Sequence, residues 1–211
     1  LTVEPPDGRN LDQLAIYYTD ADANPLASIN PSGCALPPLL TPAPHLHYGM
    51  NVRDPEIAPA LLDPLEFDWI KLWEEYNGTS DTLGTPTERL PYHVLFILDC
   101  RSYVEHLDLE AWGNHVEAIA QAGKGFVEAY EICNEPNVRP FWNGAPPDPQ
   151  RFADMLCIAH ERIRAVDPEA LIISGGLAPV GRVEGHYLEW QNHDGDKMDE
   201  RTYLEGMLDN G

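Results

Sequence analysis

The sequence predicts an α/β protein whose strands form a parallel sheet of the barrel type. Apolar runs typical of buried strands alternate with amphipathic helical segments along most of the chain. Such alternation builds parallel sheets with right-handed crossovers. A doubly wound sheet would favour a glycine-rich turn after its first strand, but "HYGMNVRD" offers a single glycine there. These observations favour a barrel.

Residues 1–44 form a proline-rich segment that includes "VEPPDG" and "CALPPLLTPAPH". This composition is typical of a linker or an extended strap rather than of a packed unit. From residue 45 the pattern changes to apolar runs separated by turn residues, so we expect residues 45–211 to form the folded unit.

Five apolar segments are expected to form strands. In chain order they are "HLHYGMNVR", "FDWIKLWEEY", "YHVLFILDC", "FVEAYEICNEP" and "ALIISGGLAP". The third is a continuous apolar run bounded by turn residues, which is typical of a strand buried on both faces, and we expect the fifth to be buried as well.

Helices are expected between and after the later strands. Asp108 can cap a helix whose apolar side chains recur three and four residues apart. Asp148 can cap the clearest helix of the sequence, which has Pro149 at its first position. The segment "DERTYLEGMLDNG" is expected to form a further helix.

The composition is strongly acidic, with 35 Asp and Glu against 13 Lys and Arg and a net charge of -22. Such a surface repels phosphate backbones and anionic lipids, so we expect no nucleic-acid or membrane partner. No stretch approaches the roughly 20 apolar residues of a membrane span, and the first residues do not resemble a signal peptide. The four cysteines lack CxxC spacing and are expected to be isolated buried thiols.

The segment "EICNEPN" places carboxylates and amides at the end of the fourth apolar run. Functional residues of parallel barrels lie at the carboxyl ends of the strands, where Glu135 is expected. Strict alternation would point Asn134 away from Glu135, so both could serve one site only if the strand bulges there. A partly desolvated glutamate can donate a proton to a leaving oxygen. The alternative is a solvated capping or surface carboxylate.

"YEICNEPN", followed by "DPQRF" and "ALIISGGLAP", resembles the clan of retaining glycoside hydrolases on (β/α)8 barrels of the TIM type, whose fourth strand ends in Asn-Glu-Pro. The resemblance runs from about residue 45 to the last residue and is best over residues 127–179. It implies a retaining O-glycosidase acting on β-linked sugars without a cofactor. It further implies that Glu135 is the general acid/base and that Asn134 binds the sugar 2-hydroxyl. Where the family usually has tryptophan, this chain has Cys133.

The resemblance also implies a second carboxylate as nucleophile, about 5–5.5 Å from the acid/base. In the family this carboxylate comes from the seventh strand, whereas this sequence supplies about five of the eight strands of a complete barrel. We therefore expect a truncated chain or a partner chain that completes the sheet. The alternative is a non-catalytic, glycosidase-like fragment that binds carbohydrate or serves as a structural subunit.

Arg101 and Trp142 are candidate sugar-binding residues. Arg101 follows the third strand and could bind a sugar hydroxyl or hold Glu135. Its alternative role is a salt bridge with Asp99 or Glu105. Trp142 lies in the loop after the fourth strand and could stack on a sugar face, or pack within that loop.

Two histidines and an ion pair complete the predicted site. His47 and His186 could reach the carboxyl edge of the sheet. In "HLH", His47 has a second histidine two residues before it, but this pair lacks a third ligand, so we expect no metal. Glu131 and Lys71 occupy inward-facing positions on neighbouring elements and are predicted to pair. The acidity and the expected polysaccharide substrate favour an extracellular or cell-surface location.

Overall fold

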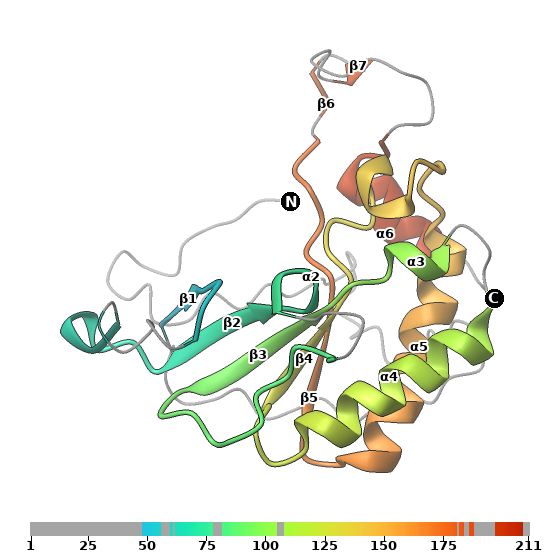
Figure 1. Ribbon diagram of the computed structural model, residues 1–211. Coiled ribbons are helices and arrows are strands. Elements are labelled where there is room, and N and C mark those ends of the chain that lie inside the picture. Colours follow the sequence, from blue (N-terminus) through green and yellow to red (C-terminus); the bar gives the residue numbers. More distant parts are fainter. Residues whose placement is uncertain are drawn as a thin grey trace, which may run out of the picture.

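The computed structural model describes residues 48–55, 60, 62–77, 82–104, 108–180, 182–183, 186–187 and 197–208. The predicted proline-rich segment 1–44 lies outside these residues. Figure 1 shows a sheet with the two longest helices on one side of it.

Five strands form one parallel sheet: β1 (Gly49–Asn51), β2 (Trp69–Trp73), β3 (His93–Leu98), β4 (Ala129–Ile132) and β5 (Leu171–Ser174). They lie side by side in chain order, and each neighbouring pair is parallel. The predicted α/β fold with a parallel sheet is therefore confirmed. A doubly wound sheet reverses its strand order, and the described strands show no reversal.

Two long helices and several short elements connect or follow the strands. The long helices are α4 (Leu109–Gly123) and α5 (Pro149–Val166). The short elements are the 3-10 turns η2 (Asp63–Leu65) and η3 (Arg139–Trp142), the helices α2 (Glu74–Asn77), α3 (Arg101–Val104) and α6 (Glu200–Leu208), and the antiparallel strands β6 (Arg182–Val183) and β7 (His186–Tyr187).

The two long helices begin where the sequence predicts. The carboxylate of Asp108 accepts hydrogen bonds from the backbone N–H groups of Glu110 and Ala111, at 3.1 and 3.0 Å. Asp148 caps α5 in the same way, and Pro149 occupies the first turn, where its missing N–H costs no hydrogen bond. Both caps are confirmed.

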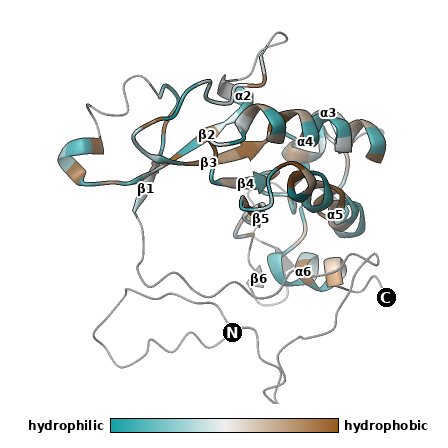
Figure 2. Ribbon diagram, turned by 90° about the horizontal axis from the view of Figure 1, so that it is seen from below, coloured by the Kyte–Doolittle hydropathy of each residue, from teal (hydrophilic) through white to brown (hydrophobic). Residues whose placement is uncertain are grey.

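The hydrophobic core lies between the sheet and these helices. Figure 1 shows α4 and α5 side by side across one face of the sheet, and Figure 2 shows hydrophobic colouring along β3. Trp112 of α4 is fully buried, and its Nε1 donates to the backbone oxygen of Met155 in α5 at 2.8 Å. Among the described helices, none is both long and apolar enough to cross a membrane.

The opposite face of the sheet is partly open, and the prediction that β5 is buried is wrong. Leu171 and Ile173 are 36% and 41% exposed. They pair in register with Ala129 and Glu131, so they lie on the sheet face that α4 and α5 do not cover. Within the described part of the chain, β5 has a strand neighbour on one side only.

Gly175 allows the end of β5 to lie close to the end of β4. A Cβ atom at residue 175 would lie 2.7 Å from the backbone oxygen of Cys133 and 2.8 Å from that of Ile132. We expect Gly175→Ala to lower the free energy of unfolding by about 1–3 kcal/mol, because backbone atoms must move. Gly176→Ala is the matched control, since a Cβ atom there meets open space. Equal midpoints for the two variants in urea denaturation would contradict this expectation.

His160 on α5 should make the fold sensitive to acid. Burial, together with nearby Arg164, lowers the pKa of His160 from its ordinary value of 6.5. As the pH falls below about 6.5, the unfolded chain binds this proton before the folded chain does, so stability declines. We expect His160→Gln to make thermal unfolding less dependent on pH between about pH 7 and 5. An unchanged slope of melting temperature against pH would argue against this role.

Candidate functional site

The turn after β4 carries the predicted catalytic residues. The strand ends at Ile132, and both Cys133 and Glu135 adopt left-handed backbone conformations, with φ of 62° and 41°. Side-chain alternation therefore does not continue to Asn134 and Glu135. Left-handed residues other than glycine cost on the order of 1–3 kcal/mol each and persist where their surroundings fix them.

One side of this turn is fixed by a disulfide to the loop that follows β3. Cys100 and Cys133 are bonded, with their Cα atoms 5.4 Å apart, and none of the described cysteines is a free thiol, so the prediction of isolated thiols is wrong. The bond spans 33 residues of sequence. Closing a loop of that length restricts the unfolded chain and stabilises the fold by about 3–4 kcal/mol.

The other side of the turn is fixed by Asn137, which is fully buried. Its Nδ2 donates to the backbone oxygens of Ala178 and Met198, at 2.9 and 3.0 Å, and its Oδ1 accepts from the Ala178 N–H at 2.7 Å. The Glu135 N–H donates to the oxygen of Gly176 at 3.0 Å. These bonds join the turn to the loop after β5 and to the segment before α6.

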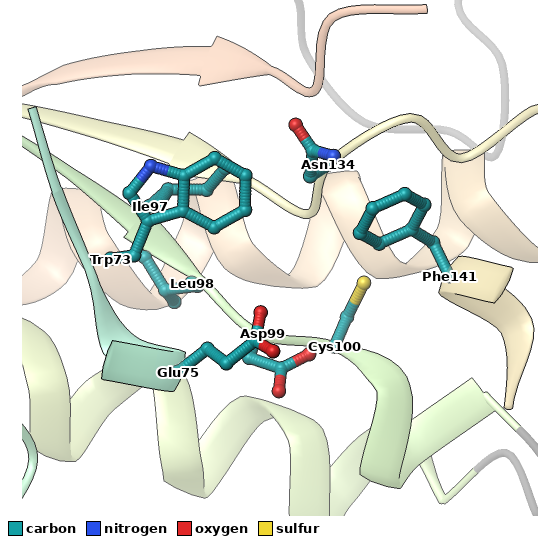
Figure 3. A pocket seen from close by; sticks show the side chains of 8 residues that line it. All are labelled: Trp73, Glu75, Ile97, Leu98, Asp99, Cys100, Asn134 and Phe141. Carbon is teal, nitrogen blue, oxygen red and sulfur yellow. The ribbon is translucent and has the colours of Figure 1, made fainter. Parts of the chain in front are cut away.

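A small pocket lies beside this turn, at the carboxyl ends of β2, β3 and β4. Figure 3 shows the rings of Trp73 and Phe141 on opposite sides of it. The amide of Asn134 and the carboxylates of Glu75 and Asp99 lie between these rings, at opposite ends of the space. The pocket therefore combines aromatic walls with hydrogen-bonding groups.

Most acidic groups at this edge already have partners. Glu74 accepts a hydrogen bond from the Asp99 N–H at 2.7 Å, and its other carboxylate oxygen lies 2.9 Å from Nε2 of His115. Glu75 lies 2.9 Å from the guanidinium of Arg101. These carboxylates are engaged in holding the loops after β2 and β3 together.

Arg101 belongs to the same network of hydrogen bonds and ion pairs. Its guanidinium donates to both carboxylate oxygens of Asp99, at 2.9 to 3.2 Å. These hydrogen bonds, with a smaller contribution from Glu75, raise the pKa of Arg101 above its ordinary value. The structure thus shows the salt bridge with Asp99 that the sequence offered as the alternative to sugar binding, whereas Glu105 lies outside the described residues.

The predicted pair between Lys71 and Glu131 is present. The Lys71 ammonium lies 2.5 Å from the Glu131 carboxylate, which is buried. The same ammonium lies 5.3 Å from the ring centre of Trp73, whose Nε1 donates to Oδ1 of Asn51 at 3.2 Å. This chain of contacts crosses β1, β2 and β4 on the sheet face opposite the helices.

Asn134 and Glu135 differ from their neighbours. Both side chains are half-buried, and neither makes a hydrogen bond or ion pair with the part of the chain that the structure describes. Among the described residues at this edge, Glu135 is thus a carboxylate whose side chain has no hydrogen-bond or ion-pair partner. Asn134 is an amide of the same kind, and of the two it is Asn134 that lines the pocket.

The remaining predicted residues lie elsewhere. Trp142 is buried under the loop, and its Nε1 donates to the backbone oxygen of Pro136, which is the packing alternative. Its neighbour Phe141 lines the pocket instead. His47 lies outside the described residues. His186 lies in β7, which pairs with β6 rather than with the main sheet, and the structure does not describe its side chain.

Sequence reasoning missed Phe141, Asn137 and the disulfide. Phe141 directly precedes Trp142 in the sequence, but the sequence does not show which of these two neighbouring rings faces the pocket. Over the residues with described positions, no group of three or more His, Cys, Asp or Glu side chains could hold a metal ion.

The fold and this edge define an α/β protein with a parallel sheet in chain order and a polar, aromatic-walled pocket at its carboxyl end. No protein-family model matches the chain. A comparison with curated proteins finds no match either. The function proposed below therefore rests on the geometry of the site.

Asn137 should be essential for holding the turn. We expect Asn137→Ala to lower the free energy of unfolding by about 1–3 kcal/mol, because the Ala178 N–H and two carbonyl oxygens lose their partner. Asn114→Ala, at an exposed position of α4, should change stability by less than about 0.5 kcal/mol. Chemical denaturation of both variants measures the difference. Similar values would show that the buried hydrogen bonds contribute little.

Proposed function

We propose that the protein is a retaining O-glycosidase acting on β-linked sugars, with Glu135 as general acid/base and Asn134 as a sugar-binding amide. One observation carries this proposal. The side chains of Asn134 and Glu135 make no hydrogen bond or ion pair with the described residues, whereas the neighbouring carboxylates at this edge do. The resemblance of "NEP" to the acid/base motif of retaining glycoside hydrolases is consistent with it.

The chemistry requires Glu135 to act twice. Protonated Glu135 donates its proton to the glycosidic oxygen while a second carboxylate attacks the anomeric carbon and forms a covalent glycosyl-enzyme. The ionised Glu135 then removes a proton from water, which attacks the intermediate and releases the sugar. The half-buried position of Glu135 suits both steps, since it is shielded from solvent but not enclosed.

The pocket suits carbohydrate as the substrate class. Aromatic rings such as Trp73 and Phe141 can cover the apolar face of a sugar ring. The amide of Asn134 offers a donor and an acceptor, and the carboxylates of Glu75 and Asp99 offer acceptors to hydroxyl groups. Phe141 takes the stacking role for which Trp142 was considered.

The proposed fold is a (β/α)8 barrel of which β1 to β5 form part. In-order parallel strands, long helices on one face and exposed apolar side chains on the other support it. The remaining strands and the nucleophile, about 5–5.5 Å from Glu135, would come from residues outside the described ranges or from a partner chain. The Cys100–Cys133 disulfide supports an extracellular or cell-surface location.

A non-catalytic carbohydrate-binding or structural role is the second candidate. It is favoured by one observation, that Glu75 and Asp99 are both paired with Arg101. No free second carboxylate thus lies in the described pocket. Binding of oligosaccharide without turnover would support this role.

Glu135→Gln tests the catalytic proposal. With a panel of aryl β-glycosides, we expect kcat/KM to fall by about 10²–10⁴. The loss should be largest for phenols that leave poorly, and smallest for dinitrophenol, which leaves without a proton.

Glu169→Gln is the control for this experiment. Glu169 is an exposed carboxylate just before β5, at the opposite edge of the sheet, and its replacement should leave turnover unchanged. Equal activity of Glu135→Gln and the unsubstituted protein would remove Glu135 from the mechanism.

A further inference from the structure

We propose that the Cys100–Cys133 disulfide is a positioning element that holds Asn134 and Glu135 in the geometry the site needs. This inference rests on the proposed function for its catalytic consequence. It assigns a specific task to the cysteine that stands where the resembling family usually has tryptophan.

The bond continues the contact between β3 and β4 beyond the point where the strands stop pairing. The last paired residues of these strands are Leu98 and Ile132. Cys133 directly follows Ile132, and Cys100 lies in the loop that leads from Leu98 into α3. Past Ile132, therefore, a covalent link holds the turn after β4 to the loop after β3.

One of the two bonded cysteines, Cys133, has an unfavourable backbone conformation. Cys133 has a φ of 62°, a left-handed conformation that residues with a side chain adopt rarely and glycine adopts readily. A second left-handed residue, Glu135, follows two positions later. A conformation of this kind persists where the surroundings fix it, and the disulfide fixes it at its first residue.

The far side of the turn is held differently. Asn137 and the Glu135 N–H bind the loop after β5, but Asn134 makes no hydrogen bond of its own to the described residues. Figure 3 shows the Cys100 sulfur at the wall of the pocket that Asn134 also lines. Asn134 is thus positioned through the backbone of Cys133, and its placement depends on the bond.

Two double variants test the proposal. Cys100→Ala/Cys133→Ala and Cys100→Ala/Cys133→Gly both lack the bond, but only the second has a residue that readily adopts positive φ. At a temperature where circular dichroism shows both variants folded, we expect kcat of the alanine variant to fall about 10–100-fold with a smaller change in KM. The glycine variant should recover part of this loss. Wild-type kcat in the folded alanine variant, or the same loss in both variants, would overturn the proposal.

Amide hydrogen exchange tests the positioning role without activity. The Glu135 and Val138 amides donate to Gly176 and Glu135 oxygens within and beside the turn. Their exchange should become more than tenfold faster in the alanine variant and less so in the glycine variant, while Phe96 in β3 stays protected. Unchanged exchange at Glu135 and Val138 would overturn the proposal. Because this measurement needs no substrate, it decides the proposal even if the unsubstituted protein hydrolyses no glycoside, a result that would count against the proposed function alone.

Discussion

The backbone turn at residues 133–137 is the constraint on which the candidate site depends. The fourth strand stops at Ile132, and two residues with side chains then adopt left-handed conformations. Neither conformation is favourable by itself, so the turn needs attachments on both sides. A disulfide to the end of β3 and the buried amide of Asn137 supply them. Because both attachments lie outside Asn134 and Glu135, those two side chains remain available.

The charge balance is consistent with the sharing of cations among carboxylates at the described carboxyl edge. The chain has 35 acidic residues against 13 Lys and Arg, so cations are scarce. At the carboxyl edge, Arg101 serves both Asp99 and Glu75, and Lys71 serves Glu131. These pairs fix neighbouring strand ends to one another. Among the described residues, the Glu135 carboxylate forms no ion pair with either cation.

The sequence was sufficient for local features and for contacts that follow from strand geometry. Helix caps at Asp108 and Asp148 depend on a few neighbouring residues. The Lys71–Glu131 pair follows from side-chain alternation, which puts both residues on one face of the sheet, on strands separated by β3. The disulfide was not predictable, because it requires knowing which loops lie side by side beyond the strand ends. The exposure of β5 was not predicted for a related reason. Its apolar side chains are typical of a buried strand, but whether they are buried depends on neighbouring elements that its own sequence does not specify.

The open face of the sheet connects the fold to the site. Ile173 is exposed beside Glu131, its partner in the β4–β5 register, and Glu131 is paired with Lys71 on the same face. Covering this face would be favourable for two reasons. It would bury apolar side chains, and it would not leave Lys71 or Glu131 buried as an unpaired charge, because these two are already paired. Excluding water from this face would also strengthen the attraction between Lys71 and Glu131. A cover on this face would therefore also hold β4, and with it the turn that carries Glu135, more firmly in register.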